Sequence, residues 1–164
     1  MTFEVYETCL GWTGLTGSPR GLKKVILPQK SKKAVLDQII SCGCETENHD
    51  VACFADLADR LRRYLQGERV AFADKLDLAG TTCFQQSVWQ TVRTIPYGET
   101  RSYGWVASQL GLPKAARAVG QALGKNPVPI VIPCHRVISS NGELGGFGGG
   151  LEIKKFLLNL EQAH

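Results

Sequence analysis

The segment IPCHRVI, residues 132–138, places a cysteine, a histidine and an arginine side by side behind an apolar run. A free thiol has a pKa of about 8.5, so only a small fraction of it is thiolate at neutral pH. A basic or cationic neighbour that stabilises the thiolate makes a cysteine a competent nucleophile. His135 and Arg136 are such neighbours of Cys134, and Pro133 fixes the backbone just before it. The residue types therefore allow nucleophilic chemistry at Cys134, with a buried structural cysteine as the alternative.

The histidine would need a partner that orients its ring. Adjacent side chains point in different directions, so His135 and Cys134 need not bond directly, and a water molecule can bridge them. A carboxylate holds the imidazole in comparable nucleophile–base pairs. The downstream candidates are Glu143, Glu152 and Glu161.

A second group of possible ligands lies in the segment CGCETENHDVAC, residues 42–53. It contains Cys42, Cys44, His49 and Cys53. The Cys-x-Cys gap is tighter than the usual spacing of structural zinc sites, and paired CxxC knuckles are missing. A metal at this segment is therefore the weaker reading, and free thiols are the alternative.

The composition is that of an ordinary globular chain, with 164 residues, of which 43% are hydrophobic and 21% charged. No apolar run approaches the roughly 20 residues that a membrane span needs. The first ten residues, MTFEVYETCL, lack the basic start and apolar stretch of a secretory signal. We therefore expect a cytoplasmic protein without membrane contact.

The net charge of +4 is concentrated in one part of the chain. Residues 81–150 contain six basic and two acidic residues, while the basic and acidic residues balance on either side of this segment. A basic C-terminal half suggests a polyanionic partner, nucleic acid first, with a chance cluster of six solvated bases as the alternative.

The first eighty residues have the pattern of a mixed α/β domain. Residues 3–28 predict two or three short strands with Gly-rich turns. Apolar spacing predicts a helix begun by Ser31 and a second one over residues 51–68 that Gly67 stops. Residues 69–82 predict a strand fragment and linker. We place the domain boundary near residue 80, giving domains 1–80 and 81–164.

The second half is expected to be mostly helical. One helix should end before Pro96. Ser102 is a suitable N-cap for the next helix and Gly111 a suitable stop, and Pro113 can open a further helix that runs to about Lys125. Two short helices joined by a tight turn form a helix-turn-helix, with two packed core helices as the alternative. The basic residues of the second helix are Lys114, Arg117 and Lys125.

The motif IPCHRV, preceded by NPVPIV and followed by GELGGFGGGLEIKKFLLNLE, resembles the O6-alkylguanine-DNA alkyltransferases. The resemblance extends upstream through IPYGETRSYGWVASQLG and AARAVGQALGKNP, and is close from about residue 82 to 161. It implies an α+β fold. A small N-terminal α/β domain with a short antiparallel sheet would precede a mostly helical, winged-helix-type domain that carries the helix-turn-helix.

The resemblance also implies an activity, direct-reversal DNA repair. The protein would bind the minor groove of double-stranded DNA that carries O6-alkylguanine, with O4-alkylthymine as a second substrate, and flip the base out. It would transfer the alkyl group irreversibly to Cys134, so that each molecule acts once, as a monomer and without cofactor or metal.

The roles of individual residues follow from the same resemblance. Cys134 would accept the alkyl group, with His135 as its base through a water molecule and Glu161 holding the histidine. Asn126 would fix the turn before the active-site strand. Tyr103 would rotate the target phosphate and protonate the leaving guanine, and Arg117 would replace the flipped base in the stack. The DNA contacts would also include Lys114, Lys125 and Arg136, and the loop closing over the base would be Gly145, Gly146, Phe147 and Gly148.

One departure and two rival functions accompany the resemblance. Many members of the family have Tyr-Ser in the closing loop where this chain has Phe147-Gly148, which removes two hydroxyls. A non-catalytic sensor of alkylated DNA is the main alternative, although relatives of that kind replace the acceptor that Cys134 supplies here. A Cys-His hydrolase is the second, and it would need an oxyanion hole and would turn over repeatedly.

Overall fold

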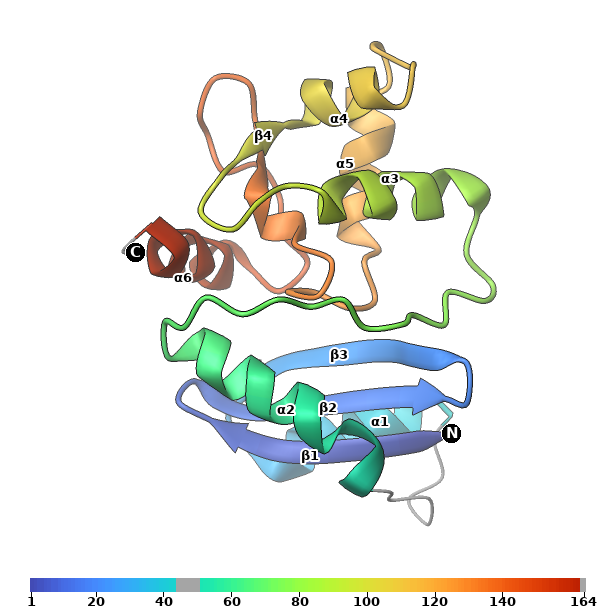
Figure 1. Cartoon of the computed structure of the whole chain (residues 1–164), viewed down its shortest axis with the longest axis vertical. Helices are drawn as coiled ribbons and strands as arrows, with labels where there is room; N and C mark the ends of the chain where they lie inside the picture. The colour runs from blue at the N-terminus through green and yellow to red at the C-terminus, as the bar shows by residue number, and fades with distance from the viewer. Residues whose placement is uncertain (44–50, 163–164) are drawn as a thin grey trace. The chain divides into compact units, whose positions relative to one another are not determined.

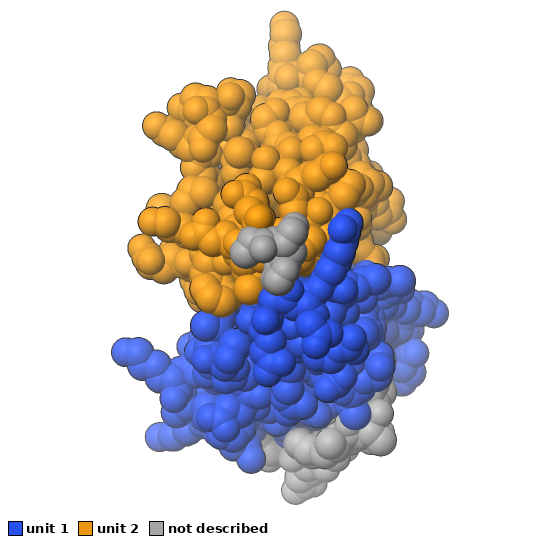
Figure 2. Space-filling view, turned by 60° about the vertical axis from the view of Figure 1, so that its left-hand side comes forward, with its two compact units in different colours: residues 1–77 blue, residues 78–164 orange. Residues whose placement is uncertain are grey.

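The computed structural model describes residues 1–43 and 51–162. The chain divides into two compact units, residues 1–77 and 78–164, which Figure 2 colours separately. Within the described residues no helix is both long and apolar enough to cross a membrane. Of the possible metal ligands, Cys44, His49 and the side chain of Cys53 lie outside the described part of the chain.

The first unit is built on a three-stranded antiparallel sheet (Figure 1). Its strands are β1 (Thr2–Thr8), β2 (Gly11–Ser18) and β3 (Gly21–Gln29), in the order β1-β2-β3. Gly21 sits in the tight turn into β3 with φ +145°, where a Cβ would lie 2.5 Å from the carbonyl oxygen of Lys75. The predicted antiparallel sheet is therefore confirmed.

Two helices cover opposite faces of this sheet (Figure 1). Helix α1 (Lys32–Ser41) packs where Gly14 leaves room for Val35, and α2 (Val51–Leu65) packs where Gly17 leaves room for Phe54. The predicted N-cap is present, because the Ser31 side chain accepts a hydrogen bond from the Ala34 backbone N–H at 3.1 Å. The two helices that the apolar spacing predicted therefore bury both surfaces of the sheet.

The second unit is mostly helical. Helix α3 (Cys83–Arg93) begins with a capping box in which Thr82 and Gln85 bond each other's backbone N–H groups. Helices α4 (Tyr103–Gln109) and α5 (Ala116–Gly124) follow, and α6 (Leu151–Gln162) ends the unit. Two short strands, β4 (Arg101–Ser102) and β5 (Val137–Ile138), pair in parallel. The indole of Trp89 is buried and donates to the Ala122 carbonyl at 3.0 Å, which ties α3 to α5.

The predicted pair of short helices is present as α4 and α5, but α5 starts later than expected. Ser102 caps α4 and Gly111, with φ +72°, follows its end, as predicted. Pro113 does not open α5. It lies in a turn closed by a hydrogen bond from Ala115 N–H to the Leu112 carbonyl at 2.9 Å, and α5 begins at Ala116. A proline suits the second position of such a turn as well as the first turn of a helix, so the sequence did not separate the two.

Candidate active site

Cys134 lies at the start of a short 3-10 turn, η1 (Cys134–Arg136), and not in the active-site strand that the resemblance implied. The apolar residues before it are buried but run as a turn, in which Ile132 N–H bonds the Val128 carbonyl at 2.9 Å and Ile130 has φ 74°. Positive φ is costly for a β-branched residue, and residues held in that way cluster at functional sites. The turn brings Cys134 into the lining of a pocket.

Asn126 connects this turn to the sulfur. Its Nδ2 donates to Cys134 Sγ at 3.1 Å and to the Ile132 carbonyl at 2.9 Å. Its Oδ1 accepts from the Val128 backbone N–H at 2.9 Å. All three bonds act on the segment that carries Cys134, so Asn126 both shapes the turn and donates to the thiol.

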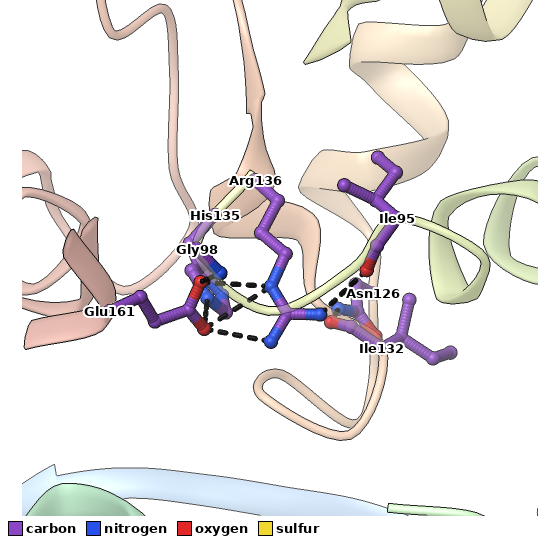
Figure 3. Close-up of polar contacts among 7 residues, drawn as sticks. All are labelled: Ile95, Gly98, Asn126, Ile132, His135, Arg136 and Glu161. Atoms are coloured by element: carbon purple, nitrogen blue, oxygen red, sulfur yellow. Dashed lines mark hydrogen bonds and ion pairs between the residues drawn. The ribbon is translucent and has the colours of Figure 1, made fainter. Parts of the chain in front are cut away.

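The two residues after Cys134 belong to a buried cluster of three charged or titratable side chains, His135, Arg136 and Glu161 (Figure 3). His135 Nε2 lies 2.7 Å from Glu161 Oε1. Arg136 donates to both carboxylate oxygens of Glu161, at 2.8 and 2.9 Å, and to the Ile95 carbonyl at 2.8 Å. The backbone N–H of Gly98 adds a further bond to Oε2 at 3.2 Å. Of the three candidate carboxylates, Glu161 therefore meets the histidine, while Glu143 and Glu152 are exposed.

The position of Arg136 corrects one expectation. We expected its guanidinium among the DNA contacts, but the side chain is only 10% exposed and is committed to Glu161 and Ile95. Withdrawing it toward a phosphate would leave the Glu161 carboxylate buried with fewer donors, which is strongly destabilising. Arg136 is part of the buried cluster.

The protonation states follow from burial. Burial raises the pKa of the Cys134 thiol, which the hydrogen bond from Asn126 and the charge of Lys154 partly offset. Burial also lowers the pKa of His135, against the opposing effect of Glu161. At neutral pH the resting site therefore holds a thiol and a neutral imidazole, and a neutral imidazole can act as a base.

Tyr103 is brought to the same place by the pairing of β4 with β5. Ser102 pairs with Ile138, so the first residue of α4 lies beside the strand that follows the cysteine turn. Burial raises the pKa of the Tyr103 phenol, which keeps it protonated as a proton donor. Gly145 touches the ring so closely that a Cβ there would lie 2.5 Å from the phenol oxygen.

A pocket of about 680 Å³ opens over the cysteine. Its lining includes Cys134, Tyr103, Arg117 of α5 and the loop residues Gly146, Phe147 and Gly148. The exposed Arg117 therefore lines the same cavity as Cys134. Lys114 and Lys125 lie exposed just outside the two ends of α5 and do not line the pocket.

The sequence reading missed Lys154, which is fully buried and donates to three backbone carbonyls. Its neighbour Lys155 is exposed, as a helical lysine usually is. The burial of Lys154 could have been predicted from its place on the apolar face of α6, three residues before the buried Leu157.

Comparison with known proteins gives a consistent result. The model of the family described as 6-O-methylguanine DNA methyltransferase, DNA binding domain, matches residues 83–163. A methylated-DNA–protein-cysteine methyltransferase of Methanosarcina acetivorans is 44% identical over 162 residues, covering 98% of each chain. A protein of the same name from Mycobacterium bovis is 54% identical over 114 residues, 70% of this chain and 68% of that one. The crystal structure of Mycobacterium tuberculosis OGT in complex with DNA matches with a TM-score of 0.82 at 42% identity, covering 99% of this chain and 94% of that one.

Proposed function

The chain belongs to the methylated-DNA–protein-cysteine methyltransferase family, and from that premise we propose that it repairs O6-alkylguanine in double-stranded DNA by taking the alkyl group onto Cys134. The observation that carries this proposal is the pocket whose lining includes Cys134, Tyr103 and Arg117. A buried histidine bonded to a buried carboxylate directly follows Cys134 in the chain.

Binding would use the helix-turn-helix of the second unit. An alkyl group on guanine O6 lies inside the duplex, so the nucleotide must leave the stack at a cost of a few kcal/mol. Arg117, exposed near the start of α5, would take the place of the flipped base. Lys114 and Lys125 would contact phosphates, and the small residues of α5 would allow close approach in the minor groove.

The transfer is a single displacement. His135 takes the thiol proton through a water molecule, and the Cys134 sulfur forms a bond to the alkyl carbon. The bond between that carbon and guanine O6 breaks, and its electron pair passes to the guanine. Tyr103 donates a proton to the leaving guanine. After the step His135 carries one proton more and Tyr103 one proton fewer, so the total number of protons is unchanged. The product is a thioether, which has no easy reverse reaction, so each molecule acts once.

The remaining residues would shape this step. Asn126 would hold the sulfur toward the pocket through its 3.1 Å bond, and Glu161 would hold His135. Residues 145–148 would close over the base. We also propose that the protein acts as a cytoplasmic monomer, needs no cofactor, accepts O4-alkylthymine as a second substrate, and uses residues 81–164 as its DNA-binding and acceptor domain. The first eighty residues form the other domain.

A labelled substrate tests the proposal. Duplex DNA containing O6-methylguanine with a radiolabelled methyl group should transfer about one label per protein molecule and then stop. Peptide mapping should place the label on Cys134. The matched control is Cys83→Ala, because Cys83 is an exposed cysteine of the same unit and should be dispensable. A protein that binds the lesion without gaining label would be the non-catalytic sensor, and one that releases the methyl group repeatedly would be a hydrolase.

A further inference from the structure

Lys154 is the one fully buried lysine among the described residues. Its ammonium donates to the carbonyls of Val137 at 2.7 Å and Gly146 at 3.2 Å, and also to that of Leu144. Three carbonyl acceptors use all three N–H donors of a lysine. The side chain is therefore held in one place and fully bonded, although a buried lysine is rare.

These acceptors belong to two separate parts of the site. Val137 directly follows the turn that holds Cys134, whereas Leu144 and Gly146 flank Gly145 in the loop beside Tyr103. Lys154 thus links the cysteine turn to the closing loop through one cation.

The position of the loop in turn determines the position of Tyr103. Gly145 touches the phenol ring, and a backbone hydrogen bond from Gly146 reaches the phenol. The Lys154 ammonium itself lies 5.8 Å from the centre of the Tyr103 ring. A shift of the loop would therefore move the proposed proton donor relative to the sulfur.

The charge of Lys154 has no carboxylate partner among the described residues, whereas the charge of Arg136 is compensated by Glu161. The groups that face Lys154 are Cys134, Tyr103 and His135. Of these, the cysteine becomes an anion as it attacks the alkyl carbon, and Tyr103 becomes one only when it gives its proton to the guanine. A buried cation without a counter-charge favours the thiolate strongly, since the interior screens it poorly.

We propose that Lys154 is a positioning residue for alkyl transfer, which holds residues 144–146 and Tyr103 over the acceptor and stabilises the Cys134 thiolate as it forms. This inference rests on the proposed function. It assigns to α6 a second contribution besides the carboxylate of Glu161.

The test compares Lys154→Met, which keeps the length but removes the charge, with Lys154→Arg, which keeps the charge. Lys155→Met is the matched control, because Lys155 is the exposed neighbour on the same helix. Two readouts are independent of DNA repair. One is the pH dependence of Cys134 alkylation by iodoacetamide, followed by mass spectrometry. The other is hydrogen exchange of the peptide covering residues 143–150.

For Lys154→Met we expect the pH midpoint of alkylation to rise by about half a unit or more. Exchange in the loop peptide should become faster, and transfer from O6-methylguanine in DNA should slow on the order of tenfold or more. Lys154→Arg should keep the pH midpoint of alkylation near that of the wild type. If Lys154→Met does not fold, Lys154→Arg still tests the proposal, because it keeps the charge. Lys155→Met should match the wild type in all three measurements.

An unchanged midpoint in Lys154→Met would overturn the electrostatic role, and unchanged loop exchange would overturn the positioning role. A failure of the proposed function looks different. In that case the wild type takes no alkyl group from DNA. The iodoacetamide measurement and the hydrogen-exchange measurement still report on the role of Lys154.

Discussion

Glu161 Oε1 lies 2.7 Å from His135 Nε2, and both side chains are buried, at 1% and 0% exposure. The same carboxylate accepts hydrogen bonds from Arg136, so its negative charge is already compensated by a permanent cation. A carboxylate compensated in this way orients the imidazole without strongly favouring its protonated form. This explains why burial is the dominant effect on the pKa of His135 and lowers it. The histidine is therefore set up as a neutral base.

Glu161→Gln should consequently do more than slow the chemistry. It removes the counter-charge of Arg136 and leaves a guanidinium buried without a carboxylate, for which we expect a loss of stability of about 3 kcal/mol or more. The rate of transfer should fall because the ring of His135 is no longer held. Urea unfolding and single-turnover transfer measure the two effects.

Glu152→Gln serves as the control for this change, since Glu152 is exposed on the same helix. It should leave both the stability and the rate close to those of the wild type. If Glu161→Gln behaves like Glu152→Gln, the relay from Glu161 through His135 to Cys134 does not operate.

Arg117→Ala should separate base flipping from chemistry. We expect transfer from duplex DNA to slow much more than transfer from free O6-benzylguanine, because only the duplex requires a base to leave the stack. Lys114→Ala should instead weaken binding to any duplex and reduce its dependence on salt by about one counterion. Equal losses on both substrates in Arg117→Ala would remove its role in flipping.

Gly145→Ala should block transfer by displacing Tyr103. The residue has φ +68°, and a Cβ would lie 2.5 Å from the phenol oxygen. Gly142→Ala is a matched control, because Gly142 also has positive φ, +86°, but its Cβ would meet open space. Both variants should lose about 1 kcal/mol of stability from the backbone strain, and only Gly145→Ala should lose activity. Single-turnover assays and thermal unfolding distinguish the two losses, and equal activity in the two variants would contradict the role of the loop.

The local elements of the fold could be predicted because their signals are local. Ser31 and Ser102 cap helices as their types suggest, and Gly67 and Gly111 follow helix ends. The start of α5 could not be predicted, because Pro113 fits a turn and a helix start equally well. The buried position of the Arg136 side chain could not be predicted from the sequence either. Only the fold brings Glu161, 25 residues away, into bonding range of its guanidinium.

The stability of the protein in alkali offers a direct check on the burial of Lys154. Burial lowers the pKa of Lys154 from 10.5 to about 8. Between these two values the unfolded chain holds a proton on this lysine that the folded protein has lost, so stability should rise with pH across this window. Below pH 8 both states are protonated, and the full cost of burying the charge is present. Lys154→Met has no such group, so the difference between the two proteins isolates it.

We therefore expect the unfolding free energy of the wild type, relative to Lys154→Met, to increase between pH 8 and 10.5 by up to roughly 3 kcal/mol. Below pH 8 the difference should be constant. Urea unfolding of both proteins at half-unit steps of pH measures it, with both carrying Cys134→Ala because the Cys134 thiol interacts with Lys154. Titrating groups distant from Lys154 are then shared by both proteins and cancel. Parallel stability curves for the two proteins over this window would mean that the Lys154 ammonium is not buried in the folded state.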